Sequence, residues 1–135
     1  MTLRLAGIYG PDRVPFLQKL RKAEPLPVAT EGYLNLIHVE DAVQVVMACS
    51  IETESPQLFV VSDGTPVIRR TYYDEVARIL GVSAIYDPPN ATSPRTRRAM
   101  GSKRVKNDRM RKKLGIDLKF PNYERGLAAI LATEG

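Results

Sequence analysis

The chain has 135 residues, of which 44% are apolar and 26% are charged, and its formal net charge is +5. These values are typical of one ordinary globular domain that buries a core without metal or disulfide support. The single cysteine, Cys49, excludes a disulfide framework and favours a reducing, cytoplasmic location. No apolar run approaches the roughly 20 residues of a membrane span, so no membrane association is expected.

The first elements alternate between strand and helix. Residues 3–8 form an apolar run of strand length that ends at a Gly-Pro pair, which predicts a buried strand followed by a loop. Val14, Leu17 and Leu20 then follow at intervals of three residues. This spacing predicts a short amphipathic helix.

Two more strands are predicted in the middle of the chain. Residues 33–39 form a short strand that runs into a helix, and Asp41 is the predicted N-cap of that helix. Residues 57–62 are rich in β-forming side chains and are closed by a turn at Asp63-Gly64.

A helix is predicted between Thr71, as its N-cap, and Gly81, as its terminator. Residues 84–86 read as a short fourth strand, cut off by two prolines. Residues 90–106 are polar and basic without an apolar period, which predicts a mobile loop.

Asn107 and Asn122 are the predicted N-caps of the last two helices. Strands that alternate with helices predict an α/β fold with a parallel sheet. The strands at 3–8 and 57–62 do not make a self-sufficient parallel sheet, and their apolar edges are a liability in water. We therefore expect these strands to seek a pairing partner.

The positive charge is concentrated in residues 95–119, which contain eleven basic and two acidic side chains, whereas acidic side chains are in excess elsewhere. The segment has the charge density of a nucleic-acid-binding surface but lacks interleaved aromatic residues for base stacking. A clamp for an anionic group and a solvated face are the other interpretations. Nucleic-acid binding through residues 95–119 therefore stays open as the alternative function.

Few residues could carry nucleophilic or metal chemistry. His38 is the only histidine and lies where a strand meets a helix, which favours a structural role. Cys49 has no neighbouring base or cation in the sequence and is predicted to be a small buried hydrophobe. The chain contains no G-x-G-x-x-G, no P-loop and no G-x-S-x-G motif. We predict no metal site and no catalytic residue.

Several segments together resemble a known family. They are residues 4–11 (RLAGIYGP), 35–42 (NLIHVEDA), 58–64 (LFVVSDG), 103–107 (KRVKN) and 120–127 (FPNYERGL). In this order they resemble the C-terminal, substrate-binding half of an extended or atypical short-chain dehydrogenase/reductase of the NAD(P)-dependent epimerase/dehydratase-like family. The resemblance covers nearly all of residues 1–135, taken as a single domain. It implies part of a Rossmann-like parallel sheet with helices, plus a small C-terminal α/β subdomain, without the N-terminal dinucleotide-binding half.

The resemblance also implies which residues are functional. In this family NAD(P) is bound by the N-terminal half, which carries a Gly-rich turn and a catalytic Tyr-x-x-x-Lys. None of the six tyrosines here is followed by lysine at that spacing, so the chain is expected to be catalytically incomplete and not to bind NAD(P) alone. The resemblance places the backbone of Leu5, Ala6 and Gly7 against the nicotinamide. It assigns substrate contacts to Tyr9, Arg13, Lys103 and Arg104.

Substrate and partners follow from the same resemblance. Many members that act on nucleotide sugars place an asparagine in the loop that corresponds to Ala6-Gly7-Ile8, and its absence argues against such a substrate here. We expect a small-molecule substrate, and either a homo-oligomer or a complex with a separate N-terminal chain.

Overall fold

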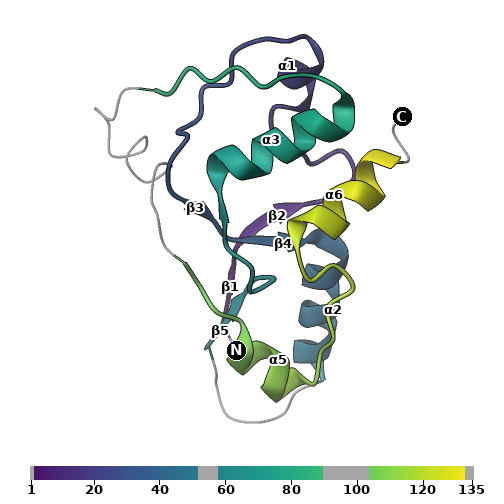
Figure 1. Ribbon diagram of the computed structural model, residues 1–135. Coiled ribbons are helices and arrows are strands. Elements are labelled where there is room, and N and C mark those ends of the chain that lie inside the picture. The colour runs from purple at the N-terminus through teal and green to yellow at the C-terminus, as the bar shows by residue number, and fades with distance from the viewer. Residues whose placement is uncertain (1, 52–57, 90–103, 133–135) are drawn as a thin grey trace.

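The computed structural model describes residues 2–51, 58–89 and 104–132 (Figure 1). Parallel strands and helices alternate along the chain, which confirms the predicted α/β class. No helix in these ranges is long and apolar enough to cross a membrane. In chain order the elements are β1 (Thr2–Leu5), β2 (Gly7–Tyr9), α1 (Leu17–Arg21), β3 (Tyr33–Leu34), β4 (Leu36–His38), α2 (Val39–Ser50), β5 (Leu58–Val61), β6 (Val67–Ile68), α3 (Arg69–Leu80), α5 (Asp108–Leu114) and α6 (Tyr123–Ala132).

Two hydrophobic cores divide the molecule. The larger one includes Leu20, Tyr72 and Leu127, and it holds α1, α3 and α6 together at one end. The smaller one includes Val45, Phe59 and Met110 and lies between the β1/β5 sheet and helices α2 and α5. In Figure 1 the first group of helices lies above strands β2 and β4, and the second group lies below them. This matches the expected combination of a partial Rossmann-like sheet and a small C-terminal subdomain.

The predicted single strand at 3–8 is wrong, because the chain breaks at Ala6 into two strands that join different sheets. β1 pairs in parallel with β5, in a register that sets Leu5 opposite Val61. β2 pairs in parallel with β4, with Gly7 opposite Leu36. β1 is also not buried as predicted, since Leu5 is 48% exposed. Parallel strands are normally covered on both faces, so the exposure of β1 marks a sheet that lacks neighbours within the described residues.

The junction of β4 and α2 is built around His38. His38 is the N-cap of α2, and its Nδ1 accepts a hydrogen bond from the Glu40 amide at 3.1 Å. This confirms the structural role predicted for the histidine. The cap predicted at Asp41 is wrong: Asp41 lies inside the first turn, and its two carboxylate oxygens accept the amides of Lys119 and Phe120 at 2.8 and 2.9 Å. Asp41 therefore ties the C-terminal segment to α2.

The region around α3 departs from the prediction at its start and agrees at its end. The helix begins at Arg69, directly after β6, so the cap predicted at Thr71 is wrong. Gly81 does terminate it, with a φ of 75° in the left-handed region that favours glycine. Residues 84–86 do not form the predicted strand, because only Tyr86 makes an isolated bridge, to Leu26.

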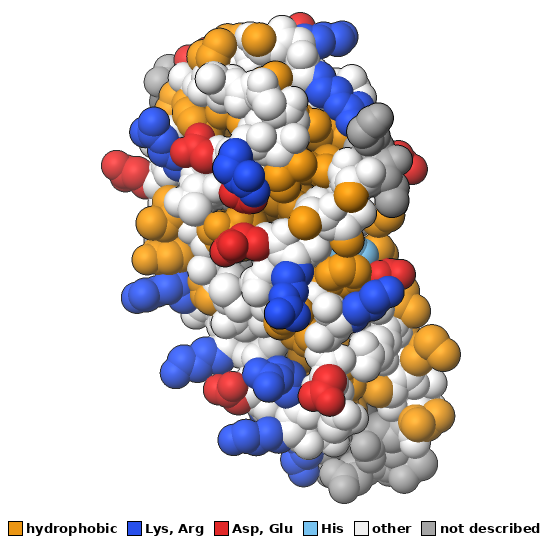
Figure 2. Space-filling view, turned by 45° about the vertical axis from the view of Figure 1, so that its right-hand side comes forward, with side chains coloured by type: hydrophobic (Ala, Val, Ile, Leu, Met, Phe, Trp, Pro, Cys, Tyr) orange, Lys and Arg blue, Asp and Glu red, His pale blue; other side chains and the backbone are white. Residues whose placement is uncertain are grey.

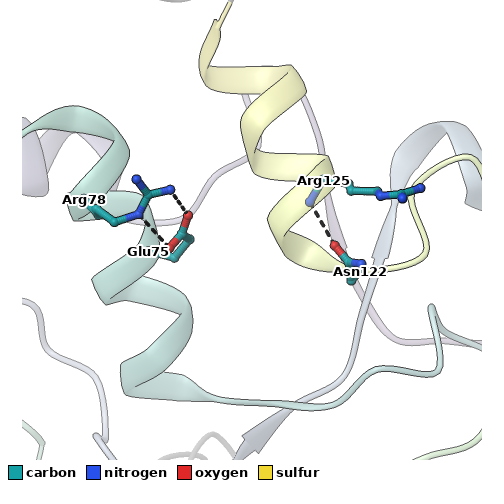
Figure 3. Close-up of polar contacts among 4 residues, drawn as sticks. All are labelled: Glu75, Arg78, Asn122 and Arg125. Atoms are coloured by element: carbon teal, nitrogen blue, oxygen red, sulfur yellow. Dashed lines mark hydrogen bonds and ion pairs between the residues drawn. The ribbon is translucent and has the colours of Figure 1, made fainter.

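The last two helices begin where the sequence predicts. Asn122 caps α6, since its Oδ1 accepts the Arg125 amide at 2.9 Å (Figure 3). Asn107 occupies the predicted N-cap position of α5, but its side chain makes no capping hydrogen bond, and its amide group instead donates to the carbonyl of Ser62 at 3.0 Å. In Figure 3 the neighbouring helix α3 carries an ion pair between Glu75 and Arg78, which lowers the pKa of the Glu75 carboxyl.

Ala23 adopts a strained backbone conformation that yields a test of the fold. It is exposed, and its φ of 56° lies in the left-handed region, which costs a non-glycine residue roughly 1 to 2 kcal/mol. We expect Ala23→Gly to raise the free energy of unfolding by about 0.5 kcal/mol, after allowing for the greater flexibility of glycine in the unfolded chain. Chemical denaturation measures this change.

The matched control for this prediction is Ala128→Gly, at an exposed position inside α6. There the same substitution should lower stability by about 1 kcal/mol, because glycine is a poor helix former. Equal destabilisation by both substitutions would contradict the left-handed geometry at Ala23.

Candidate functional site

The described surface contains a hollow of about 580 Å³ where β1 gives way to β2, and we name it the strand-end hollow. It lies beside the carboxyl end of β1, the position at which open α/β sheets bind their ligands. The residues that line it are Arg4, Leu5, Ala6, Gly7, Tyr33, Leu34, Asn35, Leu36, Val60, Arg69 and Val105. All three residues expected to face the nicotinamide, Leu5, Ala6 and Gly7, are in this lining.

Backbone hydrogen bonds fix the floor of the strand-end hollow. The amide of Ala6 donates to the carbonyl of Val61 at 2.9 Å, and the amide of Gly7 donates to the carbonyl of Asn35 at 2.9 Å. The chain thus leaves one sheet and enters the other within two residues. Because the two sheets diverge at this point, a concave surface opens between them.

A hydrogen bond between two distant chain segments holds one wall of the hollow in place. The side-chain oxygen of Asn35 accepts the amide of Val105 at 2.8 Å, which brings the segment before α5 against β3 and β4. Next to this bond, the guanidinium of Arg104 lies 5.0 Å from the centre of the Tyr33 ring. A cation at this distance over an aromatic face is attracted to it. Arg104, one of the predicted substrate contacts, therefore lies at the rim beside a lining residue.

Arg69 contributes a second fixed guanidinium. It is buried, its Nη1 donates to the carbonyl of Glu31 at 3.1 Å, and its amide donates to the carbonyl of Gly32 at 3.0 Å. Burial lowers the pKa of its guanidinium from the ordinary value. Arg69 is not predictable from the local sequence pattern, because nothing in it distinguishes Arg69 from the exposed Arg70 beside it.

The other predicted substrate contacts do not line the strand-end hollow. Tyr9 is only 1% exposed, and its hydroxyl donates to the carbonyl of Asn122 at 3.4 Å. Arg13 is exposed and lies in a tight turn with Gly10 on the far side of β2. Lys103 and most of the predicted loop at 90–106 lie outside the described residues.

An unusual buried carboxyl follows β5. Asp63 is 5% exposed; its Oδ1 accepts the Thr65 amide at 2.8 Å, whereas its Oδ2 has no hydrogen-bond partner among the described residues. Burial raises the pKa of Asp63 to about 7, the Thr65 bond opposes this, and the negative charge of Asp41 adds to it. The DG pair predicts a turn here but does not indicate that the carboxyl is buried.

Two helix N-termini in the described residues, those of α2 and α6, are poorly suited to a pyrophosphate. A pyrophosphate is normally bound at a helix N-terminus by free amides, but α2 begins with Glu40 and Asp41 in its first turn, and the Glu40 amide is already bonded to His38. α6 likewise has Glu124 in its first turn. Across the described ranges, no three His, Cys, Asp or Glu side chains are grouped as metal ligands.

Basic and acidic side chains are mixed on the face shown in Figure 2. Lys119 pairs with Glu40 at 3.4 Å, and the guanidinium of Arg109 lies 5.8 Å from the centre of the Phe59 ring. These described members of the 95–119 segment make contacts within the fold, and no observation favours the nucleic-acid alternative.

Comparison with known proteins gives a consistent picture. No protein-family model matches the chain. A 3-diazoavenalumate denitrifying reductase from Streptomyces is 30% identical over 94% of this chain, which spans 45% of that protein. A solved structure of a functionally unknown protein from Silicibacter pomeroyi is 32% identical, with a TM-score of 0.81, and it matches 98% of this chain and 47% of its own length.

A human epimerase family protein solved with NADPH has the same fold, with a TM-score of 0.82 at 15% identity, over 96% of this chain and 47% of that protein. The chain thus spans about half the length of the relatives it matches. The order of motifs, the two partial sheets and these matches agree. The chain fits the C-terminal half of solved structures from the NAD-dependent epimerase/dehydratase family, of which it spans a little under half.

Proposed function

We propose that this chain is the substrate-binding part of an NAD(P)-dependent oxidoreductase whose cofactor and proton donor are supplied by another polypeptide segment. The observation that carries this proposal is the β1/β5 sheet: it has two parallel strands, and within the described residues β1 has no second neighbour. A parallel sheet of only two strands, one of them largely exposed, is not stable alone. A cofactor-binding half that continues the sheet beyond β1 would satisfy its free backbone groups.

The exposed face of α2 supports the same conclusion. Val43, Val46 and Met47 share one face of the helix and are 52%, 49% and 66% exposed. Large apolar side chains grouped on one helical face are typical of an interaction surface. In this proposal, a cofactor-binding half supplied in the same or a separate polypeptide, or a second copy of the chain, covers part of this surface.

The chain alone is expected neither to bind nor to oxidise NADPH. Titration followed by NADPH fluorescence should show no saturable change, because the chain has no Gly-rich turn and no Tyr-x-x-x-Lys. The human epimerase family protein, which was solved with NADPH, serves as the positive control. Micromolar NADPH or NADH binding by residues 1–135 alone would contradict the proposal.

The assembly is tested by light scattering and by hydrogen exchange. The amides of β1 should exchange fast in an isolated monomer. They should become protected when a second copy of the chain, or the N-terminal half of the Silicibacter pomeroyi protein, is bound. If β1 were already strongly protected in a stable monomer, the need for a partner would be refuted.

A further inference from the structure

The walls of the strand-end hollow define the kind of molecule it accepts. Most of the lining side chains are aliphatic: Leu5, Ala6, Leu34, Leu36, Val60 and Val105. Tyr33 adds an aromatic ring, and the Arg104 guanidinium lies 5.0 Å from its centre. Ligand sites of this composition take up the apolar body of a ligand, and an aromatic wall favours a flat one.

Apart from the Tyr33 phenol, the ionisable side chains in this lining are cationic. Arg4 and Arg69 are both in the lining, and no Asp or Glu is. Arg69 is held in place by the carbonyls of Glu31 and Gly32. Arg4 is exposed, and in the described part of the chain no acidic side chain is paired with it. A planar guanidinium matches the geometry of a carboxylate or phosphate group.

A nucleotide would find few partners on these walls. A bound ribose and base need several hydrogen-bonding groups, because polar groups that lose water without replacement cost free energy. Asn35 is the one amide side chain in the lining, and its oxygen is already bonded to the Val105 amide. Gly7 offers no side chain at all. The lining therefore suits a ligand with one charged head and little other polarity.

We propose that the strand-end hollow binds a small aryl carboxylate, with its carboxylate facing Arg4 and Arg69 and its ring against Tyr33. This substrate class rests on the proposed function, in which the hollow is the substrate side of an oxidoreductase. The two ideas make separate predictions, because the ligand contacts named here all belong to this chain and need no cofactor.

The test uses 2-naphthoate as the probe and NMR of the ¹⁵N-labelled 15.0 kDa chain as the readout. We expect saturable shifts of the amides of Gly7, Asn35 and Val105. The neutral analogue 2-naphthalenemethanol should bind at least fivefold more weakly, because it lacks the charge that the arginines recognise. Uridine diphosphate, the nucleotide comparison, should not shift these amides.

The decisive variant is Arg4→Gln, which removes one guanidinium from an exposed position and should leave the fold intact. It should weaken 2-naphthoate at least fivefold and leave the alcohol unchanged. Arg125→Gln, at an exposed position on α6 outside the lining, is the matched control and should change neither affinity.

Three results would overturn the proposal: no shifts with 10 mM 2-naphthoate, equal affinity for acid and alcohol, or tighter binding of uridine diphosphate than of 2-naphthoate. An unchanged 2-naphthoate affinity in Arg4→Gln would also overturn the role of that residue. NADPH binding or oxidation by the chain alone would refute the proposed function while leaving these results untouched, so the two failures are distinguishable.

Discussion

Replacing Gly126 with alanine is expected to lower the free energy of unfolding by about 3 kcal/mol, at the upper end of the usual cost of overpacking a core. The same substitution at an exposed helical position would stabilise the helix by about 1 kcal/mol. Here a Cβ would lie 2.6 Å from Cε2 and Cζ of Tyr9 and even closer to its hydroxyl. α6 packs against Tyr9 at this point without room for a methyl group.

Tyr9 cannot easily move away from such a methyl group. Its ring is 1% exposed, it packs edge-on against His38 with centroids 5.3 Å apart, and its hydroxyl donates to the carbonyl of Asn122. Burial raises the pKa of Tyr9 above its ordinary value, so the hydroxyl remains a donor.

A double-mutant cycle with Tyr9→Phe checks the cause of this effect, measured by urea denaturation. Tyr9→Phe removes the atom nearest to the new methyl group. The two substitutions together should therefore cost less than the sum of their separate costs. A Gly126→Ala variant as stable as the original chain would show that α6 does not approach Tyr9 this closely.

The second large effect is expected from the ionisation of Asp63. The pKa of its carboxyl is raised by burial from 3.8 to about 7, so the folded protein holds this proton more tightly than the unfolded chain. The protonated Asp63 carboxyl therefore favours the folded state. This stabilisation is fully present at pH values below 3.8, the ordinary pKa of the carboxyl, and is lost as the pH rises to about 7. At about 1.4 kcal/mol per pH unit, the loss amounts to about 4 kcal/mol.

Asp63→Asn should remove this pH dependence, because an amide of the same shape does not ionise. The difference in unfolding free energy between Asp63→Asn and the original chain should grow in favour of the variant from pH 4 to pH 7 and then level off. Urea denaturation over this pH range measures it. Using the difference also cancels the contribution of His38, whose pKa is lowered by burial and which therefore acts with the opposite sign.

Asp117→Asn provides the control, since Asp117 is exposed. The free energy of unfolding of Asp117→Asn should follow that of the original chain at every pH. A difference curve for Asp63→Asn that is flat between pH 4 and pH 7 would contradict a buried carboxyl at this position.

Local sequence patterns predict many of the elements correctly. The strand at 58–61, the turn after it, the helix end at Gly81 and the cap at Asn122 all depend on residues within a few positions of each other. Backbone propensity and short-range hydrogen bonds decide these features, so the sequence contains their signal.

The errors share a physical cause. Asp41 and Asn107 have the residue types of helix caps, but tertiary partners 78 and 45 positions away hold their side chains instead. The break at Ala6 lies next to Gly7, but no local pattern predicts it, because it arises where one strand must pair with two different neighbours.

The candidate site shows the same division. Motif order in the sequence identified the family and placed Leu5, Ala6 and Gly7 at the edge of the site. The sequence does not predict the roles of Tyr33, Asn35 and Arg69 in the site, nor the hydrogen bond between Asn35 and Val105. These features depend on chain segments up to 70 residues apart meeting at one sheet edge.

The sequence by itself determined the α/β class, the single-cysteine composition and the concentration of positive charge in residues 95–119. The tertiary structure decided what the charge and the apolar strands mean. Described basic residues of that segment contact α2, β5 and Tyr33, and β1 stands exposed beside a hollow lined by two arginines. Composition is additive along the chain, whereas burial and charge pairing depend on which distant residues the fold brings together.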